Sequence, residues 1–216
     1  MPVRQIPCSV IVFARAPVPG TAKTRLVPLL GAEGAAALHA RFVKRTLETA
    51  RKGSFARIEL HGTPDVEDPF FRFCAGHYGV GLVAQTEGDL GARMLAAFDR
   101  ALGGCARALL IGCDCPALTA RDLRRAEHAL RGGADAVFSP CEDGGYALIG
   151  LRRADARLFE DIAWGSATVM SETRRRLAAL GWRWRELETL WDVDRLEDYE
   201  RLMASGLLDN QRCSAY

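Results

Sequence analysis

The chain has 216 residues, of which 49% are hydrophobic and 26% are charged, and its formal net charge at pH 7 is +2. These values are ordinary for a globular protein, and the length suits one α/β domain that buries about 70% of the surface its unfolded chain exposes. Basic residues are spread along the whole chain, which argues against nucleic-acid binding because such a surface needs Lys and Arg clustered on one face.

The cysteines and the first apolar run indicate the cellular compartment of the protein. The seven cysteines have irregular spacings and mostly apolar neighbours, unlike the dense framework of a small secreted protein. We therefore expect free thiols, no zinc and a cytoplasmic location. The apolar run at residues 8–14 is too short for a signal peptide or a membrane span, so we expect no membrane partner.

Short runs rich in Val, Ile and Leu alternate with segments of helical periodicity. The expected strands are residues 9–14, 57–60, 81–84, 108–112, 136–139 and 146–151. The expected helical faces carry Leu38, Phe42, Leu47 and Ala50, then Leu123, Ala126 and Leu130, then Val169, Thr173, Leu177 and Leu180. Thr119 and Asp122 form a capping pair at the start of the second of these helices. This order predicts a mainly parallel sheet covered on both faces, with one antiparallel strand after the Gly144-Gly145 turn.

Ligands of such sheets bind at the carboxyl ends of the strands, so the residues that follow each strand are candidates for the site. After the first strand, Pro17 and Pro19 fix two φ angles and Gly20 permits a tight turn. The cations in this stiff loop are Arg15, Lys23 and Arg25. Fixed cations with backbone N–H groups suit a polyphosphate, although a basic surface turn would look the same.

Two well-known phosphate motifs do not fit this loop. A Walker A loop needs glycines where this chain has Pro17 and Ala22, and a dinucleotide fingerprint needs three glycines where only Gly20 is present. A P-loop enzyme and a dehydrogenase are therefore not expected.

Acidic residues follow later strands. Asp114 ends the fourth apolar run, where Mg²⁺ or Mn²⁺ is a natural partner, although it could instead cap a turn. Asp192 and Asp194 offer a second metal ligand, with helix capping as the alternative. Residues 86–91 suit contacts to a base or ribose, and residues 142–146 suit close approach of a hydroxylated ligand; both could be ordinary turns.

Five segments occur together in a familiar order: residues 13–26, 85–94, 112–116, 143–150 and 192–194. With them the chain resembles bacterial GT-A-type proteins, the nucleotide-diphospho-sugar transferase family, and is similar to molybdenum cofactor and phospholactate guanylyltransferases. The resemblance implies a single Rossmann-like three-layer α/β/α domain over residues 1–208 with a mixed sheet. The polar segment 209–216 is expected to be a flexible C-terminal tail.

The resemblance also implies roles for individual residues. The catalytic candidates are Asp114, Lys23 and Arg25, and the metal candidates are Asp114, Asp192 and Asp194. The nucleotide-binding candidates are Ala14, Arg15, Gly20, Lys23, Arg25, Gln85, Gly88, Asp89 and Gly91. The acceptor-binding candidates are Glu142, Asp143, Gly144, Gly145 and Tyr146.

The function expected first is transfer of a nucleotidyl group from a nucleoside triphosphate to a small phosphate or carboxylate acceptor, with Mg²⁺ or Mn²⁺ as cofactor and pyrophosphate as product. Glycosyl transfer from a nucleotide sugar is the alternative, and a non-catalytic nucleotide-binding module is the second alternative. The partners expected are a nucleotide and a small acceptor, with the chain a monomer or homodimer. The identities of nucleotide and acceptor stay open, as does the choice between Asp192 and Asp194 as second metal ligand.

Overall fold

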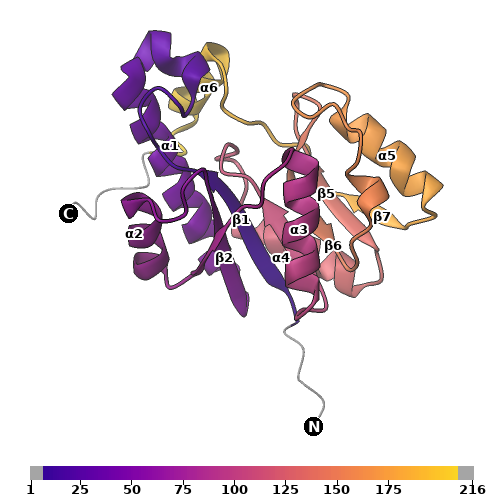
Figure 1. Cartoon of the computed structure of the whole chain (residues 1–216). Coiled ribbons are helices and arrows are strands. Elements are labelled where there is room, and N and C mark those ends of the chain that lie inside the picture. The colour runs from indigo at the N-terminus through magenta and orange to yellow at the C-terminus, as the bar shows by residue number, and fades with distance from the viewer. Residues whose placement is uncertain (1–6, 209–216) are drawn as a thin grey trace.

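A computed structural model describes residues 7–208, and the tail expected at 209–216 lies outside the described residues. The strands are β1 (Ser9–Arg15), β2 (Arg57–Thr63), β3 (Gly81–Ala84), β4 (Ala108–Ile111), β5 (Ala136–Pro140), β6 (Tyr146–Leu151) and β7 (Trp184–Glu186). The helices are α1 (Val27–Lys52), α2 (Pro69–Tyr78), α3 (Leu90–Leu102), α4 (Ala120–Arg131), α5 (Val169–Ala179) and α6 (Leu196–Ser205). Helices cover both faces of one central sheet, so the expected three-layer arrangement is confirmed (Figure 1).

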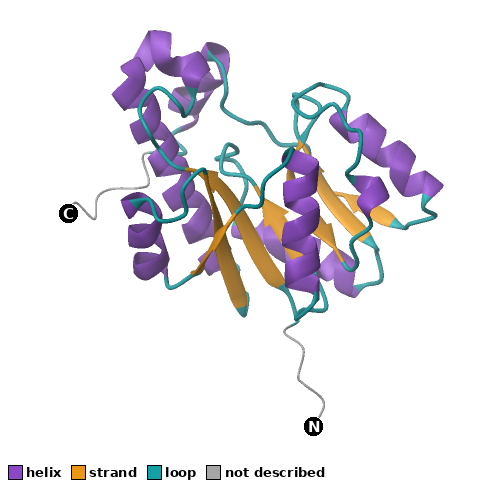
Figure 2. Ribbon diagram, viewed as in Figure 1, coloured by secondary structure: helices purple, strands orange, loops and turns teal. Residues whose placement is uncertain are grey.

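The seven strands lie in the order β3-β2-β1-β4-β6-β5-β7. Strand β6 runs antiparallel to both β4 and β5, whereas every other neighbouring pair is parallel. The turn before β6 contains Gly144 and Gly145, so the expected antiparallel strand is confirmed. The sheet is mixed and mainly parallel, and Figure 2 shows it between the helices.

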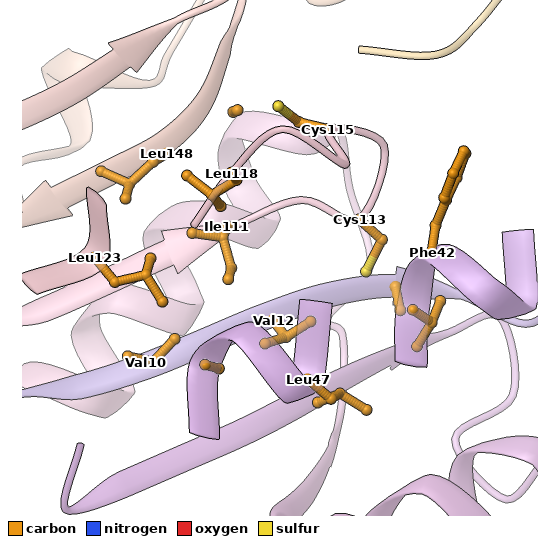
Figure 3. Close-up of a cluster of buried hydrophobic side chains, with 14 of the residues drawn as sticks. Val10, Val12, Phe42, Leu47, Ile111, Cys113, Cys115, Leu118, Leu123 and Leu148 are labelled. Carbon is orange, nitrogen blue, oxygen red and sulfur yellow. The ribbon is translucent and has the colours of Figure 1, made fainter. Parts of the chain in front are cut away.

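Alternation along the strands divides the core into two clusters, one on each face of the sheet. Val10 and Val12 of β1 pack with α1, α2 and α4, whereas Ile11 between them packs with α3 and α5. Figure 3 shows part of the first cluster, with Phe42 and Leu47 of α1 and Val10 and Val12 of β1 among the labelled side chains. Because both faces are covered, the central strands are apolar on both sides, and the polar chemistry is left to the loops at the strand ends.

Helix α1 continues a 3₁₀ turn, and together they form a long apolar segment, residues Thr24–Lys52, that could cross a membrane by length and composition alone. The backbone is kinked at Gly31, whose φ of 69° is not helical. Leu38, Phe42 and Leu47 on its apolar face are buried in the core. Packing within the domain therefore accounts for these three apolar side chains, and 39% of the most apolar window of the segment is buried.

The caps of α4 and α3 explain where these helices begin. The Thr119 and Asp122 side chains each bond to the other's backbone N–H, so the expected capping box is confirmed. Asp89 caps α3 by accepting a hydrogen bond from Ala92 N at 2.8 Å. Asp89 is also one of the residues that the sequence predicts to bind the nucleotide.

Candidate nucleotide and acceptor site

The loop after β1 and the loop after β4 meet because these strands are parallel neighbours whose carboxyl ends lie at the same edge of the sheet. Lys23 adopts a left-handed conformation with φ of 50°. Its Nζ atom lies 2.7 Å from Oδ1 of Asp114 and 2.6 Å from the carbonyl oxygen of Val193. The Lys23 side chain is only 4% exposed, so its ammonium serves as an internal partner for Asp114.

Asp114 sits at the mouth of the site, with its side chain 52% exposed. Burial opposes its ionisation, but Lys23 and His39 together outweigh this effect and lower the pKa of Asp114 below its ordinary value. The Asp114 carbonyl accepts a hydrogen bond from Val193 N at 2.9 Å. Backbone and side-chain bonds together thus hold the segment at 192–194 beside the end of β4.

Arg25 forms an ion pair with Asp194, and its guanidinium is 63% exposed. Arg15 is also exposed, and no ion pair involving its side chain occurs among the described residues. Gly20 has φ of 80° with open space around it, which confirms the tight turn expected there. Two of the three loop cations therefore face solvent, and the third is buried.

His39 of α1 is a site residue that sequence reasoning missed. Its Nε2 lies 3.0 Å from the carbonyl oxygen of Arg15, and its Nδ1 lies 3.8 Å from Oδ1 of Asp114. Because a carbonyl can only accept, Nε2 carries the proton and Nδ1 is left as a buried acceptor without a partner in the described part of the chain. Burial lowers the pKa of His39. The available signal was a polar residue on an otherwise apolar helix face.

Gln85 clamps the ends of β1 and β2. Its Nε2 donates to the carbonyl oxygens of His61 at 2.8 Å and Ala14 at 3.3 Å, while Oε1 accepts from Arg93 at 3.1 Å. Gly88 has φ of 107°, where other residues are strained. Gly91 lies against Trp164, whose Nε1 would be 2.8 Å from an added Cβ. Gln85 thus forms hydrogen bonds that support the ends of the strands, and Gly91 packs beside the Trp164 ring.

A cavity of about 320 Å³ opens beside Asp114, and we call it the acid-lined cavity. It is lined by Leu90, Gly112, Asp114, Cys115, Cys141, Asp143, Gly145, Tyr146, Ala147, Trp164, Gly165, Ser166, Val169 and Asp192. Three of the five expected acceptor residues, Asp143, Gly145 and Tyr146, are among them. Trp164, Gly165 and Ser166 are lining residues that the sequence did not single out.

The other two acceptor candidates lie outside that lining. Glu142 is turned toward Arg201, with an oxygen 2.7 Å from its guanidinium. Gly144 packs on the loop before α5: an added Cβ would lie 2.1 Å from the carbonyl oxygen of Ala167. The Gly144 carbonyl also accepts from Met170 N at 2.8 Å. Gly144 therefore ties the turn before β6 to that loop.

Asp192 links the acid-lined cavity to a second cavity of about 400 Å³, whose lining also includes Arg25, Asp143 and Asp194. Burial, reinforced by the Asp143 carboxylate, raises the pKa of Asp192 to about 6. The Asp143 carboxylate is thus close enough to disfavour the ionisation of Asp192.

The donor atoms of this cluster suit a hard cation. Within residues 7–208, no three His, Cys, Asp or Glu side chains come close enough to hold a metal ion together. Mg²⁺ generally keeps several waters and needs only one or two carboxylates plus substrate phosphates. Asp114 and Asp192, with oxygen atoms on one cavity, meet that lesser requirement. The six described cysteines are free thiols, as expected.

A family model described as "Uncharacterized protein conserved in bacteria (DUF2064)" matches residues 46–166, more than half of the chain. The chain belongs to the DUF2064 family. A crystal structure of a Desulfovibrio desulfuricans G20 protein with the provisional name nucleotide-diphospho-sugar transferase is 30% identical to it, with a TM-score of 0.84. The similarity covers 92% of this chain and 87% of that one. The expected resemblance to the nucleotide-diphospho-sugar transferase family is thereby confirmed.

More distant solved structures share the fold of this DUF2064 protein. A nucleotidyl transferase from Methanothermobacter thermautotrophicus is 17% identical, with a TM-score of 0.64 over 94% of this chain and 99% of that one. A Mycobacterium tuberculosis H37Rv protein, Rv0371C, in complex with manganese is also 17% identical, with a TM-score of 0.55 over 93% and 99% of the two chains. The search of curated proteins finds no match.

Proposed function

We propose that this DUF2064 protein is a divalent-metal-dependent transferase that moves a group from a nucleoside phosphate donor to a small acceptor, by nucleotidyl transfer with release of pyrophosphate. The transferase class follows from its family and fold. One observation carries the proposal: the exposed cations of the β1 loop and the carboxylates Asp114, Asp192 and Asp194 lie together at the carboxyl edge of the sheet.

The protein's own residues would bind and orient the donor. Arg15 and Arg25 present exposed guanidinium groups to donor phosphates, because a planar guanidinium can bind two oxygens at once. Lys23 would not contact the donor directly; its buried ammonium would hold the carboxylate of Asp114 in place. Residues 85–91 would lie near the nucleoside, with Gln85 holding the ends of β1 and β2 in register.

Asp114, with Asp192 or Asp194, would hold Mg²⁺ or Mn²⁺, which neutralises phosphate charge as it builds up during transfer. The manganese complex of the M. tuberculosis protein of the same fold supports a divalent cation. In nucleotidyl transfer, an acceptor oxygen forms a bond to the α-phosphorus while the bond from that phosphorus to the pyrophosphate oxygen breaks. Positioning and charge stabilisation supply most of the rate.

Glycosyl transfer is the second candidate, and the name of the Desulfovibrio relative specifically favours it. The same loop and carboxylates would then stabilise a departing nucleoside diphosphate. We place the enzyme in the cytoplasm, because no disulfide joins its six described cysteines.

The test is a thermal-shift screen of nucleoside triphosphates and nucleotide sugars, with and without Mg²⁺, followed by product detection. A donor at about 100 times its dissociation constant should stabilise the fold by about 2.7 kcal/mol. Pyrophosphate release supports nucleotidyl transfer, and nucleoside diphosphate release supports glycosyl transfer. Tight nucleotide binding without turnover would leave a non-catalytic nucleotide-binding module.

A further inference from the structure

The acid-lined cavity has an unusually one-sided charge. Its lining, taken from the described residues, contains three carboxylates, Asp114, Asp143 and Asp192, and no Lys, Arg or His. A phosphate or carboxylate entering it would meet charges of its own sign at close range, which is costly where solvent screening is reduced. The cavity therefore disfavours the anionic acceptor expected from the sequence.

Three cations near the cavity are already paired with other groups. Lys23 is buried between Asp114 and the carbonyl oxygen of Val193. Arg25 pairs with Asp194, and Arg201 pairs with Glu142 outside the lining. A divalent cation held by Asp114 and the donor phosphates would offset part of this negative charge, but the carboxylate of Asp143 would still face the cavity. The carboxylates of the lining therefore give the acceptor side of the cavity a negative charge that these paired cations do not cancel.

The remaining wall is apolar and aromatic. The rings of Tyr146 and Trp164 stand perpendicular, with centroids 6.5 Å apart, and Leu90 and Val169 lie beside them. Carboxylates accept hydrogen bonds from hydroxyl groups, while aromatic rings cover the apolar C–H face of a ring-shaped ligand. The three carboxylates can only accept hydrogen bonds when ionised, so a ligand that bonds to them must supply the donors.

We propose that this cavity binds a neutral polyhydroxylated acceptor, which donates hydroxyl hydrogen bonds to Asp143 and Asp192 and packs its apolar face against Tyr146 and Trp164. The proposal rests on the proposed function for the transfer step but not for binding. In that step the acceptor oxygen bonds to the electrophilic centre of the donor, and the bond from that centre to the departing phosphate oxygen breaks. The hydroxyl proton passes to the Asp143 carboxylate and then to water.

Asp143 is placed for this role by the turn that carries it. Its Oδ1 accepts a hydrogen bond from Gly145 N at 2.9 Å, which orients the carboxylate. Asp143→Asn preserves the shape and can keep that bond through the amide oxygen, while it removes the charge. This makes it a clean variant for asking whether charge sets the ligand class.

The test is ligand-observed NMR with saturation transfer on the full chain without donor, using matched probes: glucose against glucose 6-phosphate, and glycerol against glycerol 3-phosphate. We expect the neutral member of at least one pair to bind and its phosphate to bind at least tenfold more weakly. Asp143→Asn should narrow that preference about tenfold, whereas Glu160→Gln, an exposed acid outside the cavity, should leave it unchanged.

Stronger binding of the phosphates would overturn the proposal, as would binding of neither neutral probe or an unchanged preference in Asp143→Asn. These outcomes are independent of the donor screen. Failure of every nucleotide to bind would remove the proposed function while leaving the measured ligand class of the cavity standing.

Discussion

The Nζ atom of Lys23 lies 2.7 Å from Oδ1 of Asp114, which joins the loop after β1 to the loop after β4. The lysine is almost fully buried, whereas the aspartate is half exposed, so the pair presents a carboxylate to ligands and hides the cation behind it. This relationship separates the roles of the three loop cations and leads to the first prediction.

Lys23→Ala should destabilise the fold by about 1–3 kcal/mol, because Asp114 and the carbonyl oxygen of Val193 lose their common donor. The exposure of Asp114 keeps the loss below that of a fully buried pair. Arg25→Ala should change stability by only about 0.5 kcal/mol and instead weaken triphosphate binding by about 1.5–3 kcal/mol. Urea unfolding and calorimetric titration with the triphosphate and its nucleoside measure both effects. Equal stability of Lys23→Ala and wild type would contradict the role of Lys23.

Asp114→Asn should leave the fold intact and reduce turnover by about 100-fold or more. The amide can still accept a hydrogen bond from Lys23 but no longer contributes a negative charge to a metal-phosphate centre. Steady-state kinetics across a Mg²⁺ series, with circular dichroism for the fold, provides the measurement. Glu200→Gln, an exposed acid on α6, serves as the control. Wild-type turnover in excess chelator would rule out the metal.

Asp192→Asn should stabilise the protein at pH 7.5 by about 1 kcal/mol, a figure that allows for solvent screening of a partly exposed group. The folded-state pKa of Asp192 is raised to about 6 from an ordinary value of 3.8. Its protonation therefore favours the folded state, and that contribution is full below pH 4 and lost as pH rises through 6. Thermal unfolding in chelator from pH 4 to 8 should show the variant's advantage growing over that window. A pH-independent difference would mean that repulsion at Asp192 is negligible.

Gly144→Ala should destabilise the fold by at least about 2 kcal/mol and impair any reaction in the acid-lined cavity. Its φ is 91°, and the new Cβ would collide with the backbone of Ala167. Gly20→Ala is the matched control: its φ of 80° is similar but the space around it is open, so about 1 kcal/mol is expected. Denaturant unfolding gives the free energy of unfolding of both variants. Gly20→Ala reports backbone strain alone, and Gly144→Ala reports strain together with the collision. Similar losses would show that the loop at residue 167 yields easily.

Much of the sheet could be predicted because its strands are buried on both faces. Residues 146–151 were predicted with the bounds that β6 shows, and the turn before it indicated its direction. β2 runs on to Thr63 because it stays paired with β1 through His61 and Gly62, which do not look like strand residues. Strand β7 has only three residues and is stabilised by pairing with β5, so local sequence carries little signal for it.

Helix α2 was missed although its boundary signals were present. Asp68 caps it, Pro69 follows at the first turn, and Gly79 ends it in a left-handed conformation. The cluster Phe70, Phe71 and Phe73 obscured the amphipathic pattern, since Phe73 is exposed despite its apolar side chain. Boundary residues were more informative here than periodicity.

For the candidate site, the rule that ligands bind at strand ends predicts that these segments lie near one another, but it cannot predict which charged side chains pair. Three cations and several acids were expected near one another, and only the geometry shows that Lys23 is buried against Asp114. His39 reaches the site from the middle of α1, which no strand-end rule covers.

The link between Gly144 and the loop at residue 167 has an evolutionary consequence. Most of the wall of the acid-lined cavity comes from one uninterrupted stretch, residues 141–169, whereas the cationic loop and Asp114 precede it in the chain. A relative could therefore acquire a new acceptor by replacing residues 141–169 as one segment, while the cationic loop and Asp114 stay unchanged. Residues 141–169 are therefore the segment to exchange between DUF2064 proteins when the acceptor of the enzyme is to be redesigned.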